Sequence, residues 1–131
     1  MQKILLIDDD PDILEILNLE LQDDPSCTVS SSTSTEDALV LAGKNQYDVI
    51  IADWRMPVMN GTELVRALRK QGCDAHIIIY SGKGMGIDIR DALANGADYY
   101  INRGGDPDSE FAELKKQIRK YAGQQNNSQT K

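Results

Sequence analysis

The sequence predicts an α/β protein in which a five-stranded parallel sheet is covered by helices on both faces. Short apolar runs alternate with helical patterns five times over about 120 residues, which is typical of strand–helix units in a parallel sheet. The clearest runs, at 4–7, 49–52 and 77–80, are continuously apolar, as expected of strands buried on both faces. Right-handed crossovers leave few topologies, and the flavodoxin-like doubly wound order is the commonest at this size.

The first half of the chain predicts three strands and two helices. After the run at 4–7, Asp10 and Pro11 suit the N-cap and first residue of a helix, because Asp caps helices and Pro needs no N–H there. A weaker strand candidate covers 27–31, and Thr35 opens a second helix. The strand at 49–52 follows and ends at Asp53.

The second half predicts three helices and two further strands. Turn residues at 57–61 precede an amphipathic helix, and a glycine-rich loop follows the strand at 77–80. The remaining elements are listed in chain order: a helix at 62–70, a helix at 87–95, a strand at 99–101 and a helix from Asp106-Pro107 to Tyr121. We expect one domain at 1–122, with a polar, disordered tail at 123–131.

The composition excludes several classes of function. The formal net charge of −7 argues against a nucleic-acid-binding surface, which needs clustered Lys and Arg. We find no signal-peptide pattern and no apolar run of membrane-spanning length. Cys27 and Cys73 have no metal-binding spacing and suit free thiols in a reducing compartment, with a structural disulfide as the lesser alternative. The expected location is therefore the cytoplasm, without a direct nucleic-acid or membrane partner.

Polar residues follow the predicted strands at the points where each strand ends. Asp8, Asp9 and Asp10 follow the first strand, and Asp53, Ser81 and Asn102-Arg103 follow the third, fourth and fifth. In an open parallel sheet the carboxyl ends of the strands form the ligand-binding edge. We therefore expect these side chains to converge.

Carboxylates held together repel one another unless a cation lies between them. Mg²⁺ binds to one or a few carboxylates and leaves positions for phosphate oxygens. Asp10 is better explained as a helix N-cap, whereas Asp8, Asp9 and Asp53 are predicted to form a Mg²⁺ site.

These motifs resemble those of the response-regulator receiver family of two-component signalling. The resemblance covers residues 3–122 and rests on four segments, which are listed here: Asp8-Asp9; Asp53-Trp54-Arg55-Met56-Pro57-Val58-Met59-Asn60-Gly61; Ser81-Gly82; and Gly96-Ala97-Asp98 followed by Tyr100. One position departs from the pattern. The family usually has Lys-Pro after the last strand, and this chain has Arg103-Gly104.

The resemblance implies a phosphoacceptor domain that uses Mg²⁺. Asp53 would accept the phosphoryl group, and Asp8, Asp9, Asp53 and the backbone carbonyl of Arg55 would hold the metal. Ser81 and Arg103 would bind the phosphoryl group, and Ser81 and Tyr100 would form the switch. The donor would be a sensor histidine kinase or a phosphotransfer protein, and the sequence does not indicate the output partner. The domain would catalyse only its own phosphorylation and dephosphorylation.

A narrower hypothesis concerns Arg55 and Lys83, each two residues beyond a site residue. They would screen the phosphoryl group from water.

Two other functions fit parts of the pattern. A Mg²⁺-dependent phosphatase or transferase could use Asp8-x-Asp10 after the first strand, but the segment from Met56 to Gly61 would then be unexplained. A pseudo-receiver would have the same fold and act as an interaction module independently of phosphorylation. Arg103 is the feature that speaks for this alternative.

Overall fold

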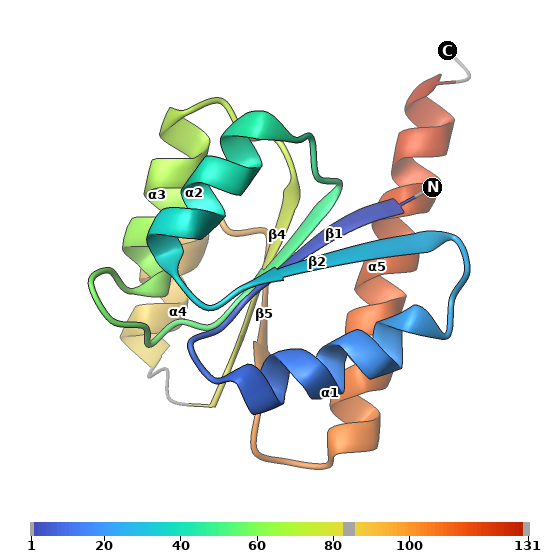
Figure 1. Ribbon diagram of the computed structural model, residues 1–131, viewed down its shortest axis with the longest axis horizontal. Coiled ribbons are helices and arrows are strands. Elements are labelled where there is room, and N and C mark those ends of the chain that lie inside the picture. Colours follow the sequence, from blue (N-terminus) through green and yellow to red (C-terminus); the bar gives the residue numbers. More distant parts are fainter. Residues whose placement is uncertain (1, 83–85, 130–131) are drawn as a thin grey trace.

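The computed structural model describes residues 2–82 and 86–129, which form one five-stranded sheet with helices on both faces (Figure 1). All strand pairs are parallel, and the strand order is β2-β1-β3-β4-β5. The strands are β1 (Gln2–Ile7), β2 (Cys27–Ser32), β3 (Val49–Ala52), β4 (His76–Ser81) and β5 (Tyr99–Asn102). The predicted flavodoxin-like doubly wound fold is confirmed.

The helices divide between the two faces as the crossovers require. They are α1 (Pro11–Gln22), α2 (Thr35–Lys44), α3 (Gly61–Lys70), α4 (Gly86–Ala94) and α5 (Pro107–Gln129). Figure 1 shows α1 and α5 on one face of the sheet and α2, α3 and α4 on the other. Among the described residues no helix is both long and apolar enough to cross a membrane.

Two apolar clusters hold these layers together, one on each face. Along β1, Leu5 and Ile7 pack in the cluster under α2, α3 and α4, whereas Ile4 and Leu6 pack in the cluster under α1 and α5. This alternation follows from the two-residue period of a strand. It also explains the continuous apolar runs, because successive side chains of a central strand enter different cores.

Helices α1 and α3 begin at capping residues. Asp10 accepts a hydrogen bond from the Asp12 N–H at 2.9 Å, so its predicted N-cap role is confirmed. At α3, Asn60 and Glu63 form a reciprocal capping box. Because both caps lie at the carboxyl edge of the sheet, they fix the loops that leave β1 and β3.

Helix α5 differs from the prediction. We expected it to end near Tyr121, but it continues to Gln129. The domain boundary at 122 and the disordered tail at 123–131 stay predictions. A helix that is already formed adds each further residue with one backbone hydrogen bond, and this segment contains no proline to stop it. Residues 130–131, and residues 83–85 of the predicted glycine-rich loop, lie outside the described residues.

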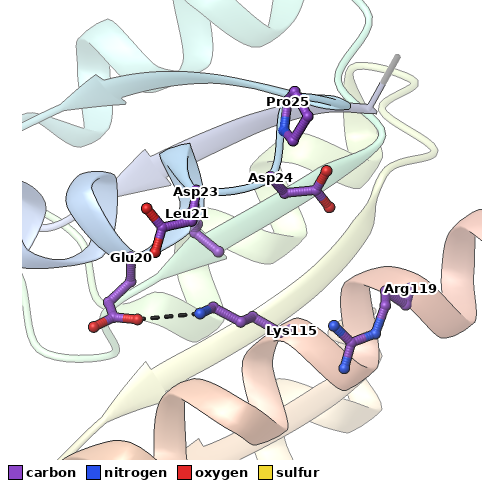
Figure 2. A pocket seen from close by; sticks show the side chains of 7 residues that line it. All are labelled: Glu20, Leu21, Asp23, Asp24, Pro25, Lys115 and Arg119. Carbon is purple, nitrogen blue, oxygen red and sulfur yellow. Dashed lines mark hydrogen bonds and ion pairs between the residues drawn. The ribbon is translucent and has the colours of Figure 1, made fainter.

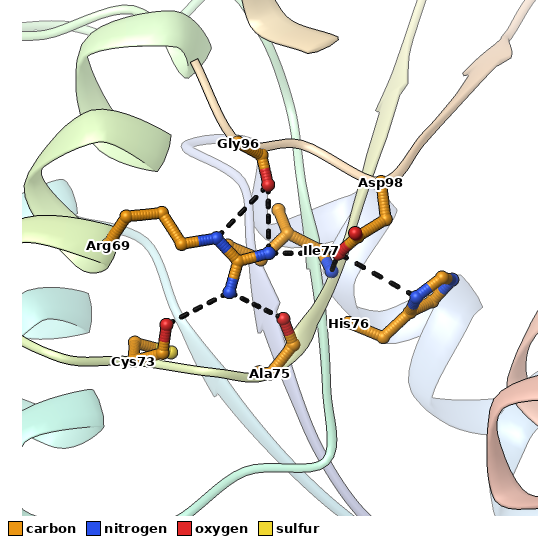
Figure 3. A network of polar contacts seen from close by, with 7 residues as sticks. All are labelled: Arg69, Cys73, Ala75, His76, Ile77, Gly96 and Asp98. Atoms are coloured by element: carbon orange, nitrogen blue, oxygen red, sulfur yellow. Dashed lines mark hydrogen bonds and ion pairs between the residues drawn. The ribbon is translucent and has the colours of Figure 1, made fainter. Parts of the chain in front are cut away.

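A polar network closes the amino edge of the sheet, where β4 and β5 begin (Figure 3). The Arg69 guanidinium donates to the carbonyls of Cys73, Ala75 and Gly96 and to the carboxylate of Asp98, over 2.8–3.1 Å. One side chain of α3 is thus bonded to the segments that lead into β4 and β5.

Candidate functional site

Three carboxylates meet where β1 and β3 end. The two strands are neighbours with Ile7 opposite Ala52, so the residues that follow, Asp8 and Asp53, emerge side by side. The Asp53 N–H donates to the Ile7 carbonyl at 3.0 Å, which extends this pairing into the loop. One carboxylate oxygen each from Asp8, Asp9 and Asp53 lies within 4.8 Å of the others. The expected convergence of these side chains is therefore found.

The carboxylates differ in their exposure. Asp8 and Asp53 are buried, whereas Asp9 is exposed. Burial raises the pKa of Asp8, and the nearby charge of Asp53 adds to this rise. Hydrogen bonds from the Asp10 N–H and from Arg103 oppose it. The site therefore holds closely spaced negative charge that is only partly compensated within the chain.

Among the residues that the structure describes, Arg103 is the cation that pairs with this cluster. Its Nη1 donates to Asp8 Oδ2 at 3.2 Å, and its Nη2 lies 3.8 Å from Asp53 Oδ1. The Arg103 N–H donates to the Ser81 carbonyl at 3.1 Å, so β4 fixes where the arginine leaves β5.

The donor set fits a hard divalent cation. Asp53 Oδ1 is buried and accepts no hydrogen bond from the described residues, although a buried carboxylate oxygen normally has such a partner. The exposed carboxylate of Asp9 adds a third oxygen ligand on the open side. Mg²⁺ prefers this combination, with carboxylate oxygens on one side and water or phosphate oxygens on the other. The part predicted for the carbonyl of Arg55, in the loop after β3, stays a prediction.

The predicted switch residues lie on the two neighbouring strands. Ser81 ends β4 and is completely buried, and Tyr100 is half-buried on β5 against the cluster under α4. The Tyr100 hydroxyl is buried, and it has no hydrogen-bond partner within the described part of the chain. Burial raises the pKa of Tyr100, while the nearby Ser81 acts in the opposite direction.

Small residues allow the loops of the site to approach closely. A Cβ on Gly82 would lie 2.8 Å from the Arg103 carbonyl oxygen, so a side chain there would push β4 and β5 apart. Gly61 would place a Cβ 2.8 Å from the Trp54 Cα. These contacts give a physical reason for the glycines of two of the sequence motifs.

Two residues beside Arg103 were not indicated by the sequence. The Arg103 Cζ lies 5.2 Å from the centre of the Tyr80 ring, and the Tyr80 hydroxyl donates to Glu110 Oε1 at 2.7 Å. Tyr80 sits in an apolar run and Glu110 in the first turns of a helix, so neither spacing marks a site. Arg55 is exposed near the site, whereas Lys83 lies outside the described residues.

Away from the acidic cluster, a hollow of about 350 Å³ lies at the C-terminal end of α1 against α5 (Figure 2). Glu20 of α1 is bonded to Lys115 of α5 across it, at 3.1 Å, and Arg119 lies nearby. Its charged groups are at the surface and partly paired with one another, so this hollow offers no reactive group comparable to Asp53.

The comparisons with known proteins agree with this geometry. The family model of the response regulator receiver domain matches residues 4–118, most of the chain. The chain belongs to the response regulator receiver domain family. Asp10, the second acid of the Asp8-x-Asp10 pattern, caps α1 and is not one of the three clustered carboxylates.

The receiver domain is similar to the nitrate/nitrite response regulator protein homolog of Haemophilus influenzae, with 32% identity over 87% of this chain and 55% of that protein. It spans about half the length of the curated relatives it matches.

Among solved structures, the Francisella response regulator 1452 receiver domain has a TM-score of 0.84 and 26% identity, over 95% of this chain and 99% of that one. The response regulator TrrA of Thermotoga maritima, solved in complex with Mg²⁺-BeF, has a TM-score of 0.78 and 31% identity, over 92% of this chain and 99% of that one.

Proposed function

We propose that this receiver domain accepts a phosphoryl group on Asp53 from a phosphohistidine, in a reaction that requires Mg²⁺. The observation that carries the proposal is the buried Oδ1 of Asp53, which has no hydrogen bond from the described residues and lies 3.8 Å from Arg103. A carboxylate oxygen in this state is available as a nucleophile, and the cation beside it can bind the oxygens of the phosphoryl group that Asp53 receives.

In the proposed reaction, an Asp53 oxygen attacks phosphorus as the bond from phosphorus to the donor nitrogen breaks. The electron pair of the broken bond stays on the imidazole nitrogen of the donor. Arg103, a cation with several N–H donors, would bind the oxygens of the transferring group. The donor would be a sensor histidine kinase or a phosphotransfer protein.

Asp8, Asp9, Asp53 and the backbone carbonyl of Arg55 would hold the Mg²⁺ ion. When bound, the ion supplies positive charge that neutralises the charge of the phosphoryl group and of the crowded carboxylates. The Mg²⁺-BeF complex of the similar Thermotoga protein supports this cofactor. Within the chain, the burial of Asp8 and Asp53 limits screening by water, and Arg103 compensates part of their charge.

Phosphorylation would then change the surface near β4 and β5. The phosphoryl group adds almost two negative charges and three acceptor oxygens, and Ser81 would donate to one of them. Ser81 and Tyr100 would transmit the change to the α4–β5–α5 face, which would bind a partner still to be identified. The domain would act in the cytoplasm as a signalling component and turn over no substrate other than its own phosphoryl group.

The alternative, a phosphorylation-independent pseudo-receiver, is less well supported. Its one argument is the replacement of Lys by Arg103. Arg103 nevertheless pairs with Asp8 and lies close to Asp53, and all three carboxylates are grouped.

Intact mass after incubation with acetyl phosphate and Mg²⁺ tests the proposal. We expect the gain of one phosphoryl group, and its loss in Asp53→Asn and in the presence of a chelator. Asp48→Asn is a matched control, because Asp48 accepts a hydrogen bond from the Lys3 N–H at the amino end of the sheet. This variant should still be phosphorylated. If a folded wild-type protein gains no mass, the pseudo-receiver becomes the better description.

A further inference from the structure

Glu110, in the first turns of α5, is a buried carboxylate held by three neutral donors. Its Oε2 accepts from the N–H groups of Gly104 and Gly105 at 3.0 and 2.7 Å, and its Oε1 accepts from the Tyr80 hydroxyl at 2.7 Å. Only 8% of Glu110 is exposed. Burying a carboxylate is costly unless its oxygens are bonded. The three hydrogen bonds reduce this cost, and they tie Glu110 to the segments on either side of Arg103.

On one side, Glu110 holds the backbone that follows Arg103. Gly104 has φ +117°, a conformation that favours glycine. The proline that usually follows the cation in the resembling family has φ fixed near −65° and no N–H, so it could neither adopt this conformation nor donate to Glu110. The Gly104-Gly105 pair thus makes the bonds to Glu110 possible.

On the other side, Glu110 holds the ring against which Arg103 lies. The Arg103 Cζ is 5.2 Å from the centre of the Tyr80 ring, within the range of a cation–π contact. Burial, and then the hydrogen bond to Glu110, raise the pKa of Tyr80, so its hydroxyl stays protonated and continues to donate. Tyr80 is 4% exposed, and the hydroxyl at the end of its ring is held by the bond to Glu110.

These contacts form a ring of interactions. Arg103 lies on the Tyr80 ring, Tyr80 donates to Glu110, and Glu110 binds the N–H groups of Gly104 and Gly105, which follow Arg103 in the chain. We infer that Glu110 is a positioning residue, which orients the guanidinium of Arg103 toward Asp8 and Asp53 and so adapts the phosphoryl-binding site to arginine. The effect of Glu110 on phosphoryl binding rests on the proposed function, whereas its effect on the orientation of Arg103 can be measured independently.

The physical reason lies in the difference between arginine and lysine. A guanidinium binds through a planar fork on a long side chain, so its orientation must be fixed before it can bind the oxygens of a phosphoryl group. A lysine ammonium is a compact point charge that needs no such orientation. Glu110 should therefore matter when residue 103 is arginine and matter little when it is lysine.

A second tyrosine–glutamate pair provides a matched control. Tyr99 of β5 donates to Glu113 Oε1 at 2.7 Å, one turn further along α5 than Glu110. This pair joins β5 to α5, as Tyr80 and Glu110 join β4 to α5, but it includes neither the backbone after Arg103 nor the ring beneath it. Glu113→Ala therefore shows how the loss of a Tyr–Glu bond between the sheet and α5 affects binding when the contacts of Arg103 stay intact.

The main experiment is a double-mutant cycle read by the fluorescence of Trp54, the single tryptophan of the sequence. Glu110→Ala and Glu113→Ala are each made with Arg103 and with Arg103→Lys, and are titrated with Mg²⁺ alone and with beryllofluoride plus Mg²⁺. With Arg103, Glu110→Ala should weaken beryllofluoride binding about tenfold, a coupling typical of residues in one network. With Arg103→Lys the loss should stay below about twofold.

Two controls sharpen this result. Glu113→Ala should bind Mg²⁺ alone like the wild type, and it should also bind beryllofluoride like the wild type. An equal loss from Glu110→Ala in the arginine and lysine backgrounds would mean that Glu110 only stabilises the fold, and would overturn the inference.

A second measurement observes the arginine directly. The ¹⁵N relaxation of the Arg103 Nε–H group should report an ordered side chain in the wild type and in Glu113→Ala, and a mobile one in Glu110→Ala. An unchanged order parameter in Glu110→Ala would overturn the positioning. If the wild type binds no beryllofluoride, the proposed function fails, and this measurement still decides whether Glu110 orients Arg103.

Tyr80→Phe covers the case in which Glu110→Ala does not fold. It keeps the ring beneath the guanidinium and removes only the bond to Glu110, and Tyr99→Phe is its control. We expect greater Arg103 mobility in Tyr80→Phe than in Tyr99→Phe, and equal mobility in the two would contradict the inference.

Discussion

At the scale of single residues, Asp8 and Asp53 show what the site costs the folded protein. Both are buried, and burial together with the charge of Asp53 raises the pKa of Asp8. A raised pKa means that the ionised form is less favourable in the folded chain than in the unfolded one. Arg103 compensates only in part, because it lies 3.8 Å from Asp53. Groups placed for binding commonly reduce stability until their ligand is present.

Asp8→Asn should therefore stabilise the metal-free protein at neutral pH by about 0.5–2 kcal/mol. The amide keeps an oxygen for the Asp10 N–H and removes the repulsion with Asp53. Urea unfolding with and without Mg²⁺ measures this. Added Mg²⁺ should stabilise the wild type and leave the variant unchanged. A variant that is less stable without metal would show that its ion pair with Arg103 outweighs the repulsion.

At the scale of elements, the loop after β3 is held at both ends. Asp53 continues the pairing with β1, while at the other end the Gly61 N–H donates to the Trp54 carbonyl at 2.6 Å. The Trp54 indole also donates to Thr62 Oγ1 at 3.1 Å. The start of α3 is thus bonded to the residue next to Asp53, and the loop that carries the site is fixed by the helix that follows it.

Gly61→Ala should lower the free energy of unfolding by about 1–3 kcal/mol, although Ala favours helices, because its Cβ would lie 2.8 Å from the Trp54 Cα. Gly43→Ala in α2 is the matched control. Its Cβ would have one neighbour, at 3.8 Å, and should raise stability by about 0.5–1 kcal/mol. Chemical denaturation of both variants compares them. Equal gains in stability would show that the approach to Trp54 relaxes without cost.

At the scale of the whole molecule, the two edges of the sheet have separate tasks. The carboxyl edge holds the acidic cluster and Arg103, whereas the amino edge of β4 and β5 is closed by Arg69 and Asp98. Figure 3 shows how the Arg69 guanidinium reaches the segments that lead into both strands. The bonds of Arg69 and Asp98 therefore stabilise β4 and β5 at the edge opposite to the residues that would react.

Arg69→Met should lower the free energy of unfolding by about 2–4 kcal/mol, because several bonds to the β4 and β5 segments are lost at once. Arg66→Met, on the same helix, loses a single exposed bond to Asn95 and should cost less than about 1 kcal/mol. Thermal unfolding compares the two. Neither change should alter Mg²⁺ affinity, and a large loss of metal binding in Arg69→Met would contradict the separation of the edges.

The convergence of the acids could be predicted because it depends on chain order and strand direction alone. Asp8 and Asp53 follow buried apolar runs, and in a parallel sheet the ends of such runs share one edge. Helix starts could also be predicted from the sequence, because the capping residues near Pro11 and Gly61 bind backbone N–H groups only two or three positions away. The extent of α5 was mispredicted because a polar composition does not by itself end a helix.

The fold class, the family and the identity of the carboxylates follow from the amino-acid sequence, because each depends on local patterns and on their order along the chain. The way in which Arg103 is held depends on packing between distant segments. Tyr80 and Glu110 lie 30 positions apart and meet through the packing of α5 on β4. No local pattern encodes that contact, since it exists only when the crossover has brought α5 back over the sheet.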